Sequence, residues 1–419
     1  MAFIQIEKVL SGEMTGKEVS LRGWIYRKRD QKKLVFIMLR DSTGVVQLAC
    51  KGIDEAATAT MESSIEVKGV VKEDGRAPGG YEIGVSELKI VGLADTFPLT
   101  KDLSEEYTRD TRHLWIRSQK LVKIFKIRAE VIKAVHAFYK EKGFIEVQPP
   151  LFTGNACEGS TTLFEVKYFG EDAYLSQTGQ LYFEALIQSL EKIYTVAPSF
   201  RAEKSRTRRH LTEFWHQEME AAWMGFDELL KMEEEFVLYI VNHVLKNCKK
   251  ELDELERDTK ELEELKIPFL RVPYKQAMEK LGKSDEDTIT DKDIKDLSEK
   301  LENKPFFLMA YPRKKKVFYM KPDPENPDVV LASDLIVPRA GEIIGGSERI
   351  SDLKELEESM KLFGLDTKDY EWYLDLRRYG TVPHSGFGMG IDRMVMWLAG
   401  AEHIMDTLPF PRTVTRFKP

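Results

Sequence analysis

The stretch FRAEKSRTRRHLTEF, residues 200–214, places five formal positive charges in fifteen positions. The whole chain is acidic, with 63 lysines and arginines against 70 aspartates and glutamates, so this basic density is local. Strand-like EKIYTVAPSF precedes the stretch and EFWHQEMEAAW continues it, which predicts a long hairpin with a basic loop. Guanidinium groups bind phosphate oxygens through paired donors. Because the five cations repel one another, we expect a polyphosphate here; a solvated loop is the alternative.

The bulk composition is that of an ordinary soluble protein. A length of 419 residues predicts two or three domains, and no apolar run reaches the length of a membrane span. The first residues, MAFIQIEKVLSGE, lack the basic and apolar segments of a signal peptide. The three cysteines are far apart and form no CxxC pair, which favours a reducing, cytoplasmic location; the lack of a long apolar run argues against a membrane partner. A net charge of −7 argues against a protein coated in basic charge, although a local basic site remains compatible with it.

Residues 1–95 predict a small closed barrel. Five segments alternate with a period of two: 19–29, 33–41, 44–50, 64–72 and 81–92. Five strands in under a hundred residues favour an OB-fold. Polar residues 96–118 predict a hinge, and 119–419 a second domain that begins with a helix ending before Gly143. Residues 226–303 predict a largely helical, solvated insertion.

Strand parity suggests a nucleic-acid surface on this barrel. In LVFIMLRD the branched residues 35, 37 and 39 suit a core, which turns Phe36, Met38 and Arg40 outward. The same parity turns Gln47 and Glu82 outward on neighbouring strands. An exposed aromatic with polar neighbours on an OB surface can stack on unpaired bases. A surface phenylalanine covered by a loop is the alternative.

Two further segments carry chemistry. DLIVPRAGEIIGGSERI, residues 334–350, sets the hard oxygen donors Asp334 and Glu342 beside a glycine turn, which fits magnesium held against a nucleotide's phosphates. GFGMGIDR alternates Gly386, Gly388 and Gly390, so that a flat ligand can lie against one side of a strand. A closely packed strand–helix junction is the alternative for the glycines.

Together, KGFIEVQPPLF with its Pro149 and Pro150, FRAEKSRTRRHLTEF and GFGMGIDRMVMWLAG resemble motifs 1, 2 and 3 of the class II aminoacyl-tRNA synthetases. The barrel before them is similar to that of the aspartate, asparagine and lysine subclass. This resemblance implies an α+β fold, with a central antiparallel sheet flanked by helices after an anticodon-binding OB domain. It also implies an ATP-dependent ligase, Mg²⁺ as cofactor, and a homodimer built through motif 1.

Within that subclass, the residues favour asparagine over aspartate. Aspartate members read QSPQLYK, whereas this chain reads QTGQLYFE, with Phe183 in place of the lysine and Glu184 after it. Removing a cation removes the reason to hold a second carboxylate. GEIIGGSER and FWHQEME also resemble the asparagine members of the archaeal or eukaryotic type, which implies L-asparagine and tRNA(Asn) as substrates. An aspartate enzyme and a tRNA-independent asparagine synthetase paralogue are the alternatives; the barrel weighs against the second.

The resemblance also implies roles for individual residues. Arg201, Arg393 and Glu342 would be catalytic, with Glu342 as the magnesium ligand and Asp334 as its helper. The ATP site would comprise Arg201, Glu203, Arg209, His210, Leu211, Phe214, Glu342, Gly390, Ile391, Asp392 and Arg393. Phe214 would stack on adenine, with Arg393 on its other face. The amino-acid site would comprise Glu158, Gln180, Arg201 and Arg349; in addition, the negative charge of Glu184, and not the resemblance, suggests that Glu184 accepts a hydrogen bond from the carboxamide nitrogen of the substrate. The anticodon site would comprise Phe36, Gln47 and Glu82.

Overall fold

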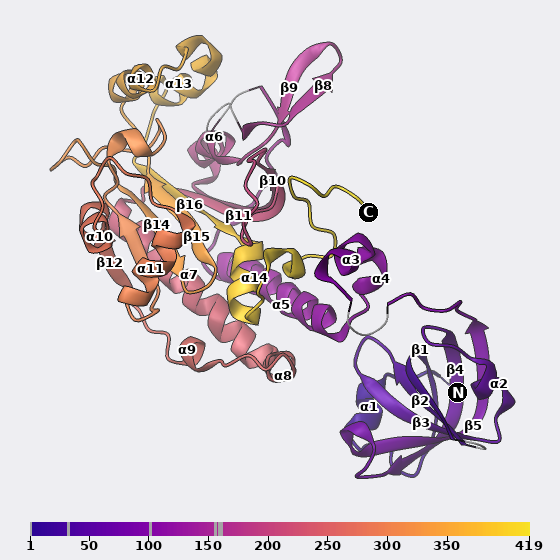
Figure 1. The fold of residues 1–419 in the computed structure, drawn as a ribbon. Helices are drawn as coiled ribbons and strands as arrows, with labels where there is room; N and C mark the ends of the chain where they lie inside the picture. Colours follow the sequence, from indigo (N-terminus) through magenta and orange to yellow (C-terminus); the bar gives the residue numbers. More distant parts are fainter. Residues whose placement is uncertain (1, 32–33, 100–102, 155–156, 158–161) are drawn as a thin grey trace. The chain divides into compact units, whose positions relative to one another are not determined.

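The computed structural model describes residues 2–31, 34–99, 103–154, 157 and 162–419 (Figure 1). The chain divides into two compact units, Met1–Thr108 and Arg109–Pro419. The first is a barrel with two short helices, and the second combines a large sheet with helices, so the expected α+β class is confirmed. In the described part of the chain, no helix has both the length and the apolar character that a membrane crossing requires.

Five strands close the first unit into a barrel in the order β1-β2-β3-β5-β4. Their bounds are β1 Glu18–Gln31, β2 Leu34–Arg40, β3 Val45–Lys51, β4 Ser64–Glu73 and β5 Tyr81–Gly92. The barrel also carries the helices α1 (Ile6–Leu10) and α2 (Asp54–Thr58). Among the described barrel strands, β3 and β5 pair in parallel and the other neighbours pair antiparallel. Each strand overlaps a segment expected from the period-two pattern, so the predicted OB barrel is confirmed.

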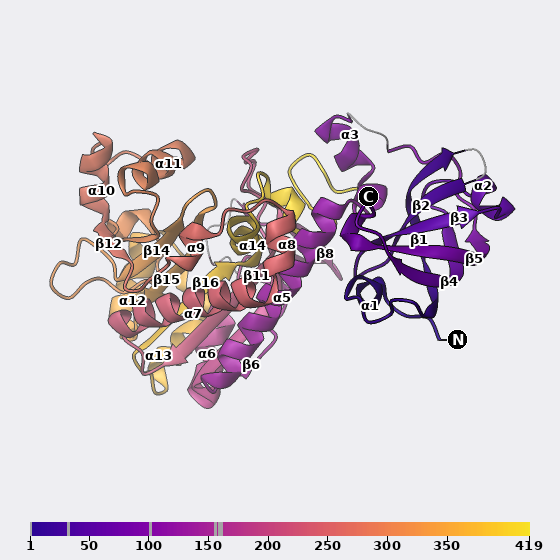
Figure 2. The ribbon, with the colours of Figure 1, turned by 90° about the horizontal axis from the view of Figure 1, so that it is seen from below.

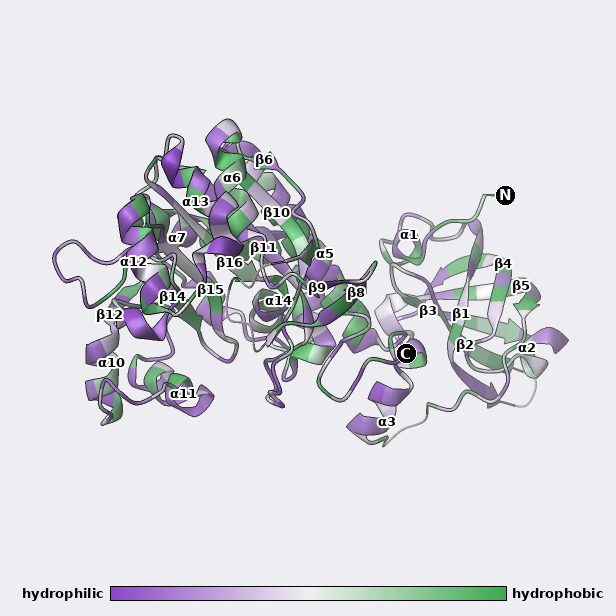
Figure 3. Cartoon of the chain, turned by 90° about the horizontal axis from the view of Figure 1, so that it is seen from above, coloured by the Kyte–Doolittle hydropathy of each residue, from purple (hydrophilic) through white to green (hydrophobic). Residues whose placement is uncertain are grey.

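The alternation of β2 decides which side chains fill the barrel. Val35, Ile37 and Leu39 are buried, while Phe36 and Met38 on the other face are half-buried. The same interleaving of hydrophobic and hydrophilic residues is visible along the barrel strands in Figure 3.

One residue departs from this parity prediction. Arg40 is only 7% exposed, because Glu62 accepts a hydrogen bond from its Nη2 at 2.8 Å. It therefore does not belong to the outward-facing surface to which its position on β2 had assigned it.

An eight-stranded sheet organises the second unit, in the order β12-β13-β14-β15-β16-β11-β10-β6. Its strands are β6 Ile145–Glu146, β10 Lys192–Phe200, β11 Glu213–Ala222, β12 Leu270–Pro273, β13 Phe306–Met309, β14 Ala332–Val337, β15 Gly341–Glu348 and β16 His384–Gly390. The strands from β13 to β10 pair antiparallel, as expected, but the outermost pairs β12–β13 and β10–β6 are parallel. A smaller sheet joins β7 (Phe152–Thr153), β9 (Glu171–Leu175) and β8 (Glu165–Tyr168).

The helices α5 and α7 run side by side over one face of the large sheet (Figure 2). From α3 onward, the helices in chain order are α3 Glu105–Asp110, α4 Arg112–Trp115, α5 Gln119–Glu141, α6 Gln180–Leu190, α7 Phe226–Asn247, α8 Lys249–Glu254, α9 Lys260–Glu263, α10 Tyr274–Leu281, α11 Asp291–Lys300, α12 Leu353–Leu362, α13 Glu371–Arg378 and α14 Ile391–Ala399. Ser118 caps α5, because its hydroxyl accepts a hydrogen bond from the Leu121 amide. The apolar faces of α5, α7 and α14 fill the main core against the sheet.

Two expectations for this unit were wrong. The segment 226–303 is largely helical but not a solvated insertion throughout, because α7 buries Phe236, Val237 and Ile240 in the main core and β12 extends the sheet. The glycines of DLIVPRAGEIIGGSERI lie within β15, and not in a turn, since β14 and β16 pair with it on both sides.

Candidate active site

The basic stretch is the loop of the hairpin between β10 and β11, as predicted. Phe200 pairs with Glu213 where the two strands end. Of the five cations, Arg201 and Arg209 line a cavity, whereas Lys204, Arg206 and Arg208 are exposed. The two arginines at the ends of the loop therefore face inward, and the three cations between them face solvent.

The face of the large sheet opposite α5 and α7 carries the site. Alternate residues of β11 point to it: Phe214, His216, Glu218 and Glu220. On the adjacent β16 the corresponding positions are glycines, and a Cβ at Gly388 would lie 2.4 Å from His216 Nε2. A Cβ at Gly386 would likewise lie 2.0 Å from Glu220 Oε2. The alternating glycines of β16 therefore leave room for side chains of β11. The sequence pattern predicted a flat ligand in that room.

The first cavity, of about 240 Å³, gathers ten of the eleven residues expected at an ATP site. These ten are Arg201, Glu203, Arg209, His210, Leu211, Phe214, Glu342, Gly390, Asp392 and Arg393. Arg201 and Arg393 come from separate motifs and share this cavity, as expected. Arg201 lies over the Phe214 ring, 5.3 Å from its centroid. Arg393 donates from Nη1 to the Glu342 carbonyl at 2.7 Å and lines the same cavity as Phe214.

Electrostatics prepare this cavity for an anion. Burial lowers the pKa of the Arg393 guanidinium; Arg201 and Arg209 add to this effect, while Glu342 opposes it. Burial also lowers the pKa of His210, and Arg393 adds to the shift. Because the three guanidinium groups repel one another, a bound polyanion would stabilise their positive charges strongly.

Two of the expected ATP residues have structural contacts instead. Ile391 does not line the cavity, because its side chain is fully buried in the main core. Asp392 does line it, but Arg128 of α5 donates to its Oδ1 at 2.5 Å and the Trp215 amide donates to its Oδ2 at 2.9 Å. Its carboxylate thus connects α5, β11 and α14.

A second cavity, of about 260 Å³, joins the first through residues that line both: Arg201, His216, Glu342 and Gly388. The expected residues Gln180 and Arg349 line it, and Phe183 contributes an apolar wall. The size and polar lining of this cavity suit a small polar molecule, and a reactive group of that molecule would lie near Arg201, where the two cavities join.

A buried ion pair that the sequence analysis missed lies in the second cavity. Arg349 donates to Glu220 from Nε at 3.0 Å and from Nη2 at 2.9 Å. Burial raises the pKa of Glu220, while Arg349 opposes the shift. Arg349 also lies 5.4 Å from the centroid of the Tyr319 ring. The period-two pattern of EFWHQEMEAAW could have placed Glu220 on the same face as Phe214, but not beside Arg349.

Glu218 is also buried at this cavity and was not expected there. Its carboxylate accepts hydrogen bonds from the Thr178 hydroxyl and, at 3.0 Å, from the Gly179 amide. Burial raises its pKa. Glu218 therefore holds the start of α6, which carries Gln180 into the cavity.

The expectation for Glu184 as a direct ligand is not met by the geometry. Its carboxylate is fully buried behind the cavity wall and is held by Arg377, Tyr373 and His384. Burial raises the pKa of Glu184, but Arg377 and His384 lower it by more, so that the net shift is downward. Gln180 Nε2 donates to Glu184 Oε1 at 3.2 Å, so Glu184 orients a cavity residue. Glu158 lies outside the described residues.

The two expected metal ligands lie together at the second cavity, and Glu342 also lines the first. A Cβ at Gly345 would be 3.3 Å from Glu342 Oε1 and 3.6 Å from Asp334 Oδ1, so both carboxylates converge on this glycine. Burial raises the pKa of Glu342 and Asp334 raises it further, as for two carboxylates that share a site. Hard oxygen donors at such spacing suit Mg²⁺, which usually takes one or two carboxylates plus substrate phosphates. Within the described ranges no group of three or more His, Cys, Asp or Glu residues suits a metal ion.

The barrel has a cavity of its own, lined by the three residues expected to bind an anticodon. Gln47 Nε2 donates to Glu82 Oε2 at 2.6 Å, and Phe36 lies one strand away. Arg27, Arg29 and Arg76 also line it. Aromatic, amide and cationic groups therefore share one surface, as unpaired bases require.

Comparisons with known proteins agree with this arrangement. Residues 104–414 match the family described as tRNA synthetases class II (D, K and N), and residues 19–91 match the OB-fold nucleic acid binding domain. The asparagine–tRNA ligase of Thermococcus gammatolerans is 46% identical, over 97% of each chain. That of Thermoplasma acidophilum is 43% identical, over 99% of this chain and all of the relative. The crystal structure of asparaginyl-tRNA synthetase from Pyrococcus horikoshii complexed with asparaginyl-adenylate superposes with a TM-score of 0.96 at 43% identity, covering 100% of both chains.

Proposed function

Because this chain belongs to the class II tRNA synthetase family of the aspartate, lysine and asparagine enzymes, we propose that it joins L-asparagine to tRNA(Asn) at the expense of ATP. The relatives that match it over nearly their whole length are asparagine–tRNA ligases. The structural observation that supports asparagine as the substrate is the Glu220–Arg349 ion pair in the second cavity.

The chemistry of that pair distinguishes the two amino acids. A carboxamide has both a donor and an acceptor, so it can donate to Glu220 and accept from Arg349. An aspartate carboxylate has only acceptors and would meet the charge of Glu220 at the same place. Phe183 gives no cation to compensate for that repulsion. The cavity thus favours the neutral side chain.

In the first step, the asparagine carboxylate attacks the α-phosphate of ATP, giving asparaginyl-adenylate and pyrophosphate. Arg201 lines both cavities and therefore lies where the two substrates meet, so it stabilises the charge that develops at the α-phosphate. Arg209 and Arg393 hold the outer phosphates, and Phe214 offers its ring to the adenine. In the second step, the acyl group moves to the terminal ribose of the tRNA.

Asp334 and Glu342 would hold Mg²⁺, the family's general cofactor. When bound, the ion would neutralise phosphate charge during the first step. The convergence of both carboxylates on Gly345 supports this assignment.

The barrel surface of Phe36, Gln47 and Glu82 would read the anticodon by stacking and hydrogen bonding. We also propose a homodimer, because large apolar side chains are exposed around β6, β7 and the β8–β9 hairpin. They are Ile145, Leu151, Phe152, Tyr168 and Phe169. The cytoplasmic location stays a prediction from the sequence.

Amino-acid-dependent pyrophosphate exchange, run with asparagine and aspartate in parallel, tests the proposal. Exchange with asparagine at least a hundredfold more efficient than with aspartate, together with charging of a tRNA(Asn) transcript, is the expected result. Preferential exchange with aspartate would make the protein an aspartate enzyme. Asparagine formation from aspartate and ammonia without tRNA would identify it as the synthetase paralogue.

A further inference from the structure

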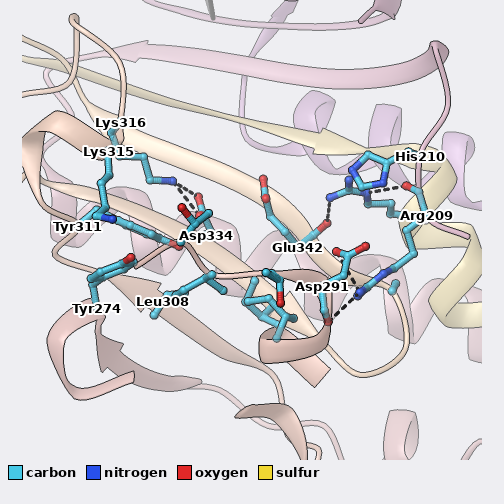
Figure 4. Close-up of a pocket in the computed structure, with 17 residues that line it drawn as sticks. Arg209, His210, Tyr274, Asp291, Leu308, Tyr311, Lys315, Lys316, Asp334 and Glu342 are labelled. Carbon is cyan, nitrogen blue, oxygen red and sulfur yellow. Dashed lines mark hydrogen bonds and ion pairs between the residues drawn. The ribbon is translucent and has the colours of Figure 1, made fainter. Parts of the chain in front are cut away.

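A third cavity, of about 460 Å³, shares Arg209, Glu342 and Arg393 with the first cavity (Figure 4). It is also lined by two lysines that the proposed reaction does not use. Lys315 and Lys316 follow one another at the end of a short 3-10 turn. Both also line the second cavity, together with Asp334 and Glu342. The lysines therefore stand where the second and third cavities meet.

Their contacts differ sharply. Lys316 Nζ donates to Asp334 Oδ1 at 2.7 Å and to Oδ2 at 2.8 Å. It also lies 3.9 Å from the centroid of the Tyr311 ring, whose hydroxyl donates to Asp334 Oδ2 at 2.5 Å. Lys315 Nζ instead donates to the carbonyls of Glu286 and Asp287. Figure 4 shows Lys316 and Tyr311 around Asp334, with Glu342 further along the cavity.

The ammonium of Lys316 thus binds an oxygen that a metal ion would need. Asp334 Oδ1 accepts from Lys316 and is also the Asp334 oxygen that lies nearest the Gly345 position on which both carboxylates converge. The Lys316 ammonium binds both oxygens of Asp334 and so occupies the positions that a divalent cation would need. Its positive charge also repels that cation. The side chains of Lys316 and Asp334 are 17% and 12% exposed, so solvent screens this interaction only partly.

We propose that Lys316 is an internal counterion that keeps Asp334 from binding a divalent cation until the nucleotide arrives. This inference rests on the proposed metal site. Arg209 and Arg393, the proposed ligands of the outer phosphates, line both the first cavity and the third, so the phosphates of ATP bring negative charge to the edge of a cavity that Lys316 lines and give its ammonium another partner. Asp334 can then bind the ion that accompanies the phosphates. Lys316 thereby makes cation binding depend on the nucleotide, and the enzyme takes up the two together.

Mn²⁺ binding to the full-length protein, followed by electron paramagnetic resonance without nucleotide, tests the proposal. Removing a unit charge so close to the ion predicts at least a roughly tenfold tighter Mn²⁺ affinity for Lys316→Gln than for wild type. Asp334→Asn in the same background is expected to abolish the gain. Lys315→Gln is the matched control, and Lys316→Arg keeps the charge; both are expected to bind Mn²⁺ as wild type does. Thermal unfolding checks that each variant is folded.

Two results would overturn the inference, and they are distinguishable. Equal Mn²⁺ affinities of wild type and Lys316→Gln without nucleotide would show that Lys316 does not oppose the ion, while the metal site could still stand. If Asp334→Asn and Glu342→Gln leave Mn²⁺ binding unchanged in the presence of a non-hydrolysable ATP analogue, the metal site itself is wrong, and the inference falls with it.

Discussion

Replacing Glu220 by glutamine is expected to move the amino-acid preference from asparagine towards aspartate. In the wild type, Glu220 neutralises Arg349 through two hydrogen bonds of 3.0 and 2.9 Å inside a cavity from which solvent is largely excluded. Glutamine keeps the shape and one acceptor but removes the negative charge. Arg349 then gains an uncompensated positive charge that an aspartate carboxylate can satisfy.

The size of the change follows from Coulomb's law. A unit charge about 4 Å from another contributes about 4 kcal/mol at an effective dielectric constant of about 20. Halving that value for water that enters the cavity with the substrate leaves about 2 kcal/mol, or a roughly thirtyfold change in relative rates. We therefore expect the ratio of kcat/KM for aspartate to kcat/KM for asparagine to rise about thirtyfold.

Pyrophosphate exchange with both amino acids on the same preparation measures this ratio. Breaking a buried ion pair costs about 3–5 kcal/mol of stability, so part of the Glu220→Gln protein can be unfolded. The ratio is independent of that fraction, because the same active molecules turn over both substrates. Glu220→Asp retains the charge and is expected to keep the asparagine preference. An unchanged ratio in Glu220→Gln would refute the role given to the pair.

Three further predictions concern other parts of the molecule. Among the described residues, no group donates a hydrogen bond to either buried carboxylate oxygen of Glu233, and burial raises the pKa of this residue well above 4.5. Because the pKa of Glu233 is higher in the folded state than in the unfolded state, its protonation contributes fully to stability below pH 4.5. This contribution is lost as the pH rises through the pKa of the folded state. Glu233→Gln should therefore increase stability by about 1–3 kcal/mol at pH 8 and less at pH 5, in urea unfolding; an equal effect at both pH values would contradict this. Phe36→Ala should weaken tRNA charging by about 1–3 kcal/mol through a higher KM for tRNA, while exchange without tRNA stays unchanged. A parallel loss of exchange would count against a role in tRNA binding. Gly388→Ala should reduce asparagine-dependent exchange by at least about tenfold, because its Cβ would lie 2.4 Å from His216 Nε2. Wild-type exchange would show that the site tolerates a shifted His216.

The parts of the fold that follow from local periodicity could be predicted from the sequence. The barrel strands and the hairpin around 200–214 depend on alternation and turns within short segments, and both have the expected form. The glycines of GEIIGGSER were interpreted as a turn because glycine is common there. They form a strand because partners distant in sequence pair with both of its edges. Such pairing cannot be read from the segment alone.

Individual contacts in the site were harder to predict for a related reason. Charge logic placed Glu184 against the substrate, but it lies one turn after Gln180 on α6 and faces Arg377 of α13. Glu220 became recognisable only when the register of β11 placed it beside Arg349. The sequence gives no sign of these pairs, since each joins residues more than a hundred positions apart.

The carboxylate of Asp392 has a mechanical consequence for the whole catalytic unit. One oxygen holds Arg128 in the middle of α5, and the next residue along the chain is Arg393, which lines the first cavity. A displacement of α5 along its axis is therefore transmitted to Arg393 through one hydrogen bond and the backbone that follows it. Mutations on the distant side of α5 should then alter nucleotide affinity without touching the nucleotide, and a neighbouring subunit that pushes on this helix would reach the reaction centre by the same route.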